Sequence, residues 1–231
     1  MTPDLARFEK KTGINFKNKD LLKEAFTHSS YLNENPSWPV PHNERLEFLG
    51  DAVLELAVTE KLFKKYPEKP EGELTSFRAA LVNANMLSEV AQELEMNDYL
   101  LLSRGEAKDV GRARQYILAN AFEAFVGALY LDRGYDSAEK FIDAWVLKRL
   151  GEVVSKQLFR DPKSLFQERA QEIVGLTPRY DVLKEWGPDH NKHFVVGIYL
   201  GEELAAEGEG PSKQEAQQKA AEAALAAKGW G

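Results

Sequence analysis

Two segments of the chain carry acidic side chains where the hydrophobic pattern predicts a helix. In the first, residues 43–58, Glu44, Glu47 and Asp51 fall within roughly 60° of one another at the helical spacing of about 100° per residue. The other positions are apolar nearly all round, which predicts a buried helix. Because a buried carboxylate is unfavourable unless it is paired, protonated or bound to metal, this stripe could bind a cation.

The second segment, residues 116–131, makes the same point with fewer polar groups. Glu123 is its only charged residue and Asn120 its only amide, and the two are three residues apart on one helical face. Two such helices could together surround a hard cation such as Mg²⁺ with oxygen ligands. Two alternatives stay open, since the acids could be solvated or could pair with one of four arginines, Arg45, Arg78, Arg112 and Arg114.

The composition restricts the class of protein. The chain has 231 residues, 43% of them hydrophobic, which is enough for one or two packed domains. The absence of cysteine excludes disulfides and thiolate metal sites. The charged N-terminus does not resemble a signal peptide, and the longest nearly uncharged run is shorter than the about 20 residues of a membrane span, so we expect a soluble, cytoplasmic protein. The net charge of −7 is not that of a typical nucleic-acid binder, so such a function must depend on local patches.

The hydrophobic period changes near residue 175. Before it, apolar residues recur at helical spacing in residues 21–26, 46–63, 74–94, 116–131 and 138–150. After it, the alternation from Phe194 to Leu200 predicts a strand, followed by a tight turn at Gly201-Glu202 and preceded by a strand at residues 180–186.

Helices at residues 163–174 and from Pro211 to about Gly229 complete an α-β-β-β-α order in the C-terminal part. We therefore expect an all-α N-terminal domain at residues 1–154, a linker at residues 155–161, and a small α+β domain at residues 162–231.

The motifs in both parts resemble a known family. The string NERLEFLGDAVL (43–54) is similar to the signature of ribonuclease III, and THSS (27–30), EGELTSFRAALV (71–82) and ILANAFEAFVGALYLD (117–132) follow in the order of its nuclease domain. The C-terminal part resembles a double-stranded-RNA-binding domain through LFQE (165–168), PRY (178–180), GPDHNKHF (187–194) and GEGPSKQEAQQKAA (208–221).

The resemblance implies a metal site for Mg²⁺, with Mn²⁺ as a possible substitute. Glu47, Asp51 and Glu123 match three of the family's four metal-site carboxylates, and Asp51 and Glu123 would be the catalytic pair. The fourth position is usually aspartate and is Asn120 here, so the site would carry −3 instead of −4. We expect this difference to weaken the binding of any second metal ion.

The resemblance also implies partners. Glu44 matches a position near the dimer and RNA contacts, and Phe48 matches an aromatic residue that inserts into the partner subunit of a homodimer, although core packing is an alternative for Phe48. RNA contacts are implied for Gln167, Glu168, His190, Lys213, Gln214 and Gln217. Because the family usually has lysines at positions 214 and 217, we expect few phosphate contacts and a shallow dependence of binding on salt.

The implied function is hydrolysis of double-stranded RNA by metal-activated water, in the processing of ribosomal precursors and messenger RNA. Products would carry 5′-phosphate and 3′-hydroxyl ends with short 3′ overhangs. His28 is interpreted as structural, and neither a membrane nor an organic cofactor is expected. The alternatives are a catalytically weakened RNA-binding regulator, favoured by Asn120, and a hydrolase of small phosphate compounds, which would leave the C-terminal domain without a purpose.

Overall fold

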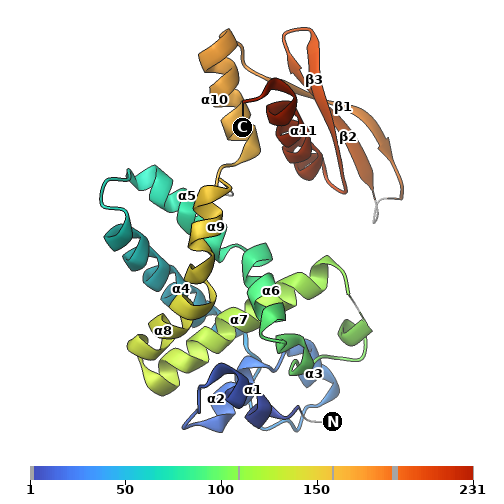
Figure 1. Cartoon of the computed structure of the whole chain (residues 1–231). Coiled ribbons are helices and arrows are strands. Elements are labelled where there is room, and N and C mark those ends of the chain that lie inside the picture. Colours follow the sequence, from blue (N-terminus) through green and yellow to red (C-terminus); the bar gives the residue numbers. More distant parts are fainter. Residues whose placement is uncertain (1–2, 109, 158, 189–191, 231) are drawn as a thin grey trace. The chain divides into compact units, whose positions relative to one another are not determined.

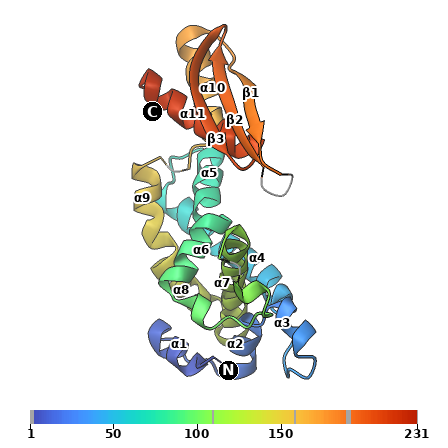
Figure 2. The ribbon, with the colours of Figure 1, turned by 90° about the vertical axis from the view of Figure 1, so that its right-hand side faces the viewer.

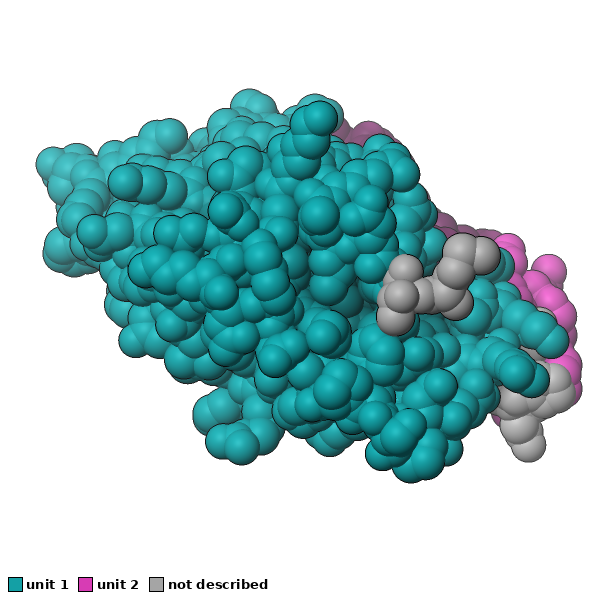
Figure 3. Space-filling model, turned by 90° about the horizontal axis from the view of Figure 1, so that it is seen from below, with its two compact units in different colours: residues 1–159 teal, residues 160–231 magenta. Residues whose placement is uncertain are grey.

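The computed structural model describes residues 3–108, 110–157, 159–188 and 192–230, and it divides the chain into two compact units. Unit 1 comprises residues 1–159 and unit 2 residues 160–231, shown in separate colours in Figure 3. Phe159, which was expected in the linker, packs its ring against Phe77 of unit 1 with centroids 4.5 Å apart. Across the described residues, none of the helices combines the length and apolarity that crossing a lipid bilayer would demand.

Unit 1 is helical, as predicted, and its long helix α7 runs through the middle of the unit (Figure 1). The α-helices are α1 Leu5–Thr12, α2 Lys19–Ala25, α3 Ser29–Glu34, α4 Glu44–Lys65, α5 Glu71–Val82, α6 Ala84–Glu93, α7 Arg112–Arg133, α8 Tyr135–Trp145 and α9 Leu150–Ser155. Short 3-10 turns, η1 Met96–Asp98, η2 Glu106–Lys108 and η3 Leu147–Arg149, connect some of them. Half of α7 is buried, including every residue from Ala124 to Leu129, so this helix forms the core of the unit.

The apolar stretch at residues 74–94 forms two helices, where the periodicity predicted one. Asn83 separates them because its extended backbone ends α5, while its side chain accepts a hydrogen bond of 2.9 Å from the backbone N–H of Met86 and caps α6. Asparagine is a favoured residue at such a cap, and the turn therefore has a local cause in the sequence.

Helices α4 and α7 cross at two glycines, and this crossing positions the candidate site. A Cβ atom at Gly50 would lie 1.8 Å from the backbone oxygen of Glu123, and a Cβ atom at Gly127 would lie 2.2 Å from the backbone oxygen of Leu46. Any larger side chain at either position would push the helices apart. Glycine inside a helix is destabilising by about 1 kcal/mol relative to alanine, and the close approach is what explains it here.

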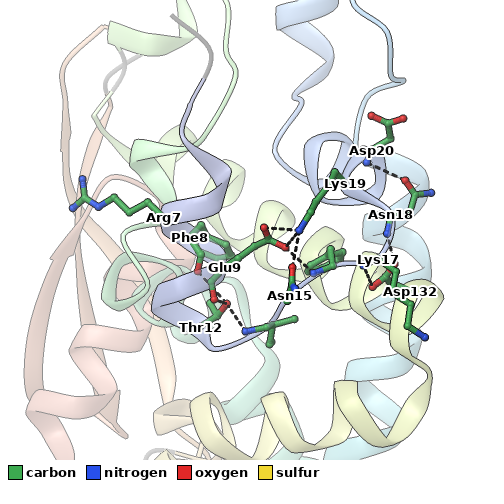
Figure 4. Close-up of polar contacts among 12 residues, drawn as sticks. Arg7, Phe8, Glu9, Thr12, Asn15, Lys17, Asn18, Lys19, Asp20 and Asp132 are labelled. Atoms are coloured by element: carbon green, nitrogen blue, oxygen red, sulfur yellow. Dashed lines mark hydrogen bonds and ion pairs between the residues drawn. The ribbon is translucent and has the colours of Figure 1, made fainter.

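A carboxylate near the end of α7 fixes the turn between α1 and α2 (Figure 4). Asp132, whose side chain is only 2% exposed, accepts hydrogen bonds of 2.8 Å from the backbone N–H groups of Lys17 and Asn18. Burial alone would raise the pKa of Asp132, but these N–H donors and the neighbouring Arg133 outweigh it and leave the pKa below its ordinary value. This carboxylate is therefore fully used by the fold.

Unit 2 has the predicted α-β-β-β-α order: α10 Pro162–Val174, β1 Arg179–Trp186, β2 His193–Leu200, β3 Glu203–Gly210 and α11 Lys213–Lys228. The strands form an antiparallel sheet in the order β1-β2-β3, and both helices lie against one face of it (Figure 2). The alternating apolar residues of β2 face these helices and are buried.

The turns of unit 2 follow local chemistry. Gly201 has φ +60° in the turn between β2 and β3, the left-handed conformation that the sequence predicted there. The start of α11 differs from the expectation, because the helix begins at Lys213 and not at Pro211. Ser212 caps it, with its hydroxyl accepting the N–H of Glu215 at 3.2 Å. Gly229 ends this helix in the left-handed conformation, as predicted.

Candidate active site and RNA-binding surface

The four residues predicted as metal ligands lie together at the α4–α7 crossing. Glu47 and Asp51 flank Gly50 on α4, while Asn120 and Glu123 lie one turn apart on α7, with Glu123 itself in backbone contact with Gly50. The charges of Glu47 and Asp51 both act on Glu123, so the two helices present these groups to one another.

Glu123 is the least compensated carboxylate of the group. Burial, followed by the charges of Asp51 and Glu47, raises its pKa to about 8. No arginine contributes to this shift among the described residues, which argues against the alternative that a buried arginine pairs with Glu123. A carboxylate held beside two others without a cationic partner is a suitable oxygen ligand for a divalent cation.

Glu47 is half-buried and hydrogen-bonded to the side chain of Asn120. Its pKa is raised by burial and by the charges of Glu44 and Asp51, while the bond to Asn120 lowers it in part. Asn120 therefore contacts the acidic group directly, and its amide can donate to a carboxylate that an aspartate would repel.

Asp51 is exposed, so the expectation that the whole acidic stripe is buried is wrong for this residue and for Glu44, which is also exposed. Over the described part of the chain, no three acidic or histidine side chains converge closely enough to ligate one ion as they stand. The crossing thus provides a face of oxygen ligands and not a finished coordination sphere.

Helix α4 is not buried all round, contrary to the prediction from its composition. Phe48 is 82% exposed, which rules out core packing within this chain, and Leu56 of the same helix is 57% exposed. Farther along, the exposed ring of Phe63 borders a pocket of about 360 Å³ between α4 and α5. This pocket is lined by apolar and polar side chains, among them Thr59, Leu62, Leu74, Thr75 and Arg78.

His28 and Asn43, outside the predicted ligand set, secure the start of α4 and its surroundings. His28 accepts the backbone N–H of Ser30 at its Nδ1 and so caps α3. The buried Asn43 donates from its amide to the backbone oxygen of Ala25, and its own backbone N–H bonds to Thr27. The sequence analysis did not single out Asn43, although it immediately precedes the acidic stripe.

The RNA-binding residues predicted on unit 2 lie on its two helices. Gln167 and Glu168 are exposed on α10 and line one hollow together with Ser164, Gln171 and Glu172. Lys213 and Gln214 are exposed in the first turn of α11, and the half-buried Gln217 follows one turn later. His190 lies outside the described residues.

Sequence reasoning missed Lys163, which contacts this set. Its Nζ atom donates to Oε1 of Gln217 at 2.7 Å and lies 5.1 Å from the ring centroid of Tyr180. No spacing rule in the sequence could have paired residues 54 positions apart on two different helices.

Comparison with known proteins places both units in one family. A family model described as ribonuclease-III-like matches residues 18–150, and a double-stranded RNA binding motif matches residues 162–228. The chain is 45% identical over 223 residues to ribonuclease 3 of Borreliella burgdorferi, covering 96% of this chain and 91% of that protein. It is 46% identical over 222 residues to ribonuclease 3 of Oceanobacillus iheyensis, covering 96% and 97% respectively.

Among solved structures, the chain is similar to the nuclease domain of ribonuclease III from Campylobacter jejuni. That structure is described as showing flexibility in a region involved in dimer formation of the nuclease domain. The identity is 38% and the TM-score 0.57, covering 63% of this chain and 97% of that one. With a family model over more than half of its length and relatives matched nearly end to end, this chain belongs to the ribonuclease III family.

Proposed function

We propose that this chain is an endoribonuclease that hydrolyses phosphodiester bonds in double-stranded RNA, in the processing of ribosomal precursors and messenger RNA in the cytoplasm. The observation that carries the proposal is Glu123, a carboxylate whose pKa is raised to about 8 by burial and by Asp51 and Glu47 at the glycine crossing of α4 and α7. Such an arrangement is unfavourable for the fold, and a bound cation would relieve it.

The ligands proposed for this cation are Glu47, Asp51, Asn120 and Glu123. The family is metal-dependent, and we propose Mg²⁺, with Mn²⁺ as a substitute, because all four donors are oxygens. Bound there, Mg²⁺ would supply an activated water and would neutralise charge on the scissile phosphate.

The chain's own residues have separate roles at this site. The glycine crossing holds Glu123 against α4, and Asn120 orients Glu47 through their side-chain hydrogen bond. Asp51 is exposed, so it is the carboxylate that would hold the cation within reach of a phosphate at the surface. Cleavage at this face would leave 5′-phosphate and 3′-hydroxyl ends.

We further propose that the active form is a homodimer. Phe48 is too exposed to contribute much to the fold of one chain, and the same helix borders a pocket beside Phe63. In an isologous interface a residue of one subunit contacts a complementary surface of the other, so antiparallel α4 helices could place Phe48 in the partner's pocket. Two sites related by a two-fold axis would each cut one strand, leaving short 3′ overhangs.

The dimer can be tested with Phe48→Ala. The free energy of unfolding of one chain should change by less than about 0.5 kcal/mol, because the ring is exposed. Sedimentation velocity should instead show loss of the dimer. A variant that stays dimeric would show that Phe48 does not hold the subunits together.

Recognition of RNA over DNA is assigned to unit 2. A-form helices present their 2′-hydroxyls in a wide minor groove, which domains of this kind bind by shape. We propose that Gln167 and Glu168 contact one minor groove, His190 the next, and Lys213 the phosphates between them. Gln214 and Gln217 belong to the same RNA-binding surface.

The decisive assay uses labelled double-stranded RNA with Mg²⁺, with EDTA, and with the Glu123→Gln variant in Mg²⁺. Cleavage by the unmodified chain in Mg²⁺ alone supports the proposal. Binding without cleavage in all three would favour the second candidate, a catalytically weakened regulator, to which the neutral side chain of Asn120 points. Cleavage that persists in EDTA would rule out a metal-dependent centre.

A further inference from the structure

Lys163 of α10 lies beside α11 and β1, and the groups that it contacts there are neutral. Its ammonium donates to the neutral Oε1 of Gln217 at 2.7 Å and lies over the ring of Tyr180 at 5.1 Å. Asp161, the acidic residue nearest to Lys163 in sequence, accepts at its Oδ2 from the N–H and hydroxyl of Ser164. An amide and an aromatic ring orient an ammonium without adding a negative charge beside it.

Lys213 is oriented in the same way. Its Nζ atom lies 5.6 Å from the ring centroid of Phe194. Phe194 belongs to a small cluster with Val196 and Ala216, against which the ring of Tyr180 also packs. Two ammonium groups, one from each helix, therefore lie over two rings of a single cluster at the N-terminal end of α11.

This end of α11 suits an anion. The helix has 16 residues, and the N–H groups of its first turn give this end a partial positive charge. Two oriented ammonium groups beside it form a basic patch, next to Glu215 of the same turn, in a unit whose net charge is −3 by sequence (9 basic and 12 acidic residues from Arg160 onward). The patch differs in chemistry from the hollow on α10, which offers amides, a hydroxyl and carboxylates.

We propose that Lys163 contacts a phosphodiester group of double-stranded RNA, supplying from α10 the charge that Gln217 does not supply from α11. Gln217 then has a definite task, since its carbonyl holds the ammonium in place. This inference rests on the proposed function, because it assumes that unit 2 binds duplex RNA.

The test is the salt dependence of RNA binding by the full chain, measured in EDTA so that the RNA stays intact. Each phosphate contact contributes about 0.9 to the slope of log K against log salt concentration. Lys163→Gln should make this dependence on salt shallower, by about 0.9 in the slope per bound copy of unit 2. It should also weaken binding several-fold at low salt. Lys184→Gln, which removes an exposed lysine of β1, is the matched control and should leave the slope unchanged.

A charge-relocation variant separates a phosphate contact from a structural role. Lys163→Gln combined with Gln217→Lys should recover most of the slope, whereas loss of a bond that merely ties α10 to α11 would lower the unfolding midpoint and leave the slope unaffected. If Lys213→Gln lowers the slope and Lys163→Gln does not, this inference is wrong while the proposed function stands. If the unmodified chain binds no duplex RNA, the proposed function itself fails.

Discussion

Helix α7 carries two carboxylates of the same chemistry with opposite surroundings. Asp132, near its C-terminal end, accepts two backbone N–H groups, and its pKa lies below the ordinary value. Glu123, nine residues earlier, lies beside two other carboxylates, and its pKa is raised to about 8. Burial is the largest single influence on both, so burial alone does not separate a structural acid from a functional one. The neighbouring groups separate the two acids: backbone N–H donors stabilise the Asp132 carboxylate, and two other carboxylates surround Glu123.

The largest effect is expected from Gly50→Ala, which acts on the Glu123 side of the comparison. Its Cβ would lie 1.8 Å from the backbone oxygen of Glu123, so the helices must separate. We expect unit 1 to lose at least about 3 kcal/mol of unfolding free energy and all cleavage activity. Chemical denaturation measures the first. The control is Gly151→Ala, which should be tolerated because a Cβ there meets nothing within 4 Å. Equal losses of unfolding free energy in both variants would contradict the view that the close approach at Gly50 holds the two helices together.

Asp132→Ala should have the next largest effect, confined to stability. It leaves the N–H groups of Lys17 and Asn18 without their acceptor, at a cost on the order of 3 kcal/mol. Because the folded pKa of Asp132 is lowered, its contribution is present above the unfolded pKa and is lost as the pH falls through the folded value. The variant should therefore remove part of the acid sensitivity of unfolding, while the exposed Asp20→Ala should not.

Asn120→Asp should have a smaller effect with two opposite parts. Without metal, a fourth carboxylate replaces the amide that is hydrogen-bonded to Glu47, so the unfolding midpoint should fall. With metal, the added charge should strengthen cation binding, and the Mg²⁺ concentration for half-maximal cleavage should drop by about tenfold, equivalent to about 1.4 kcal/mol. An unchanged Mg²⁺ dependence would contradict the view that the asparagine weakens metal binding.

Much of this comparison was predictable from the sequence. Glu123 stands out as the one charge in a long apolar run, and the alternation in β2 predicted the sheet of unit 2. Both signals are local, because one helix or strand contains the whole pattern.

What the sequence analysis missed depends on packing between distant segments. Leu56 belongs to a helix that was predicted to be buried, because an apolar residue has the same periodic signature whether it faces a core or the surface. The role of Gly50 and Gly127 had a usable signal, since glycine inside a helical pattern usually has a packing reason. Lys163 had none, because its partners on α11 and β1 are set by the tertiary fold.

The most direct test of the account is the thermal unfolding midpoint of unit 1 as a function of pH, for the unmodified chain and Glu123→Gln, with and without Mg²⁺. Because the folded pKa of Glu123 is raised from 4.5 to about 8, the unfolded chain releases its proton first, and stability in EDTA should fall as the pH rises between these values. Mg²⁺ should reverse this loss in the unmodified chain, while Glu123→Gln should show neither the loss nor the rescue. If both proteins respond alike to pH and to Mg²⁺, Glu123 is not the uncompensated charge that a cation at this crossing would stabilise.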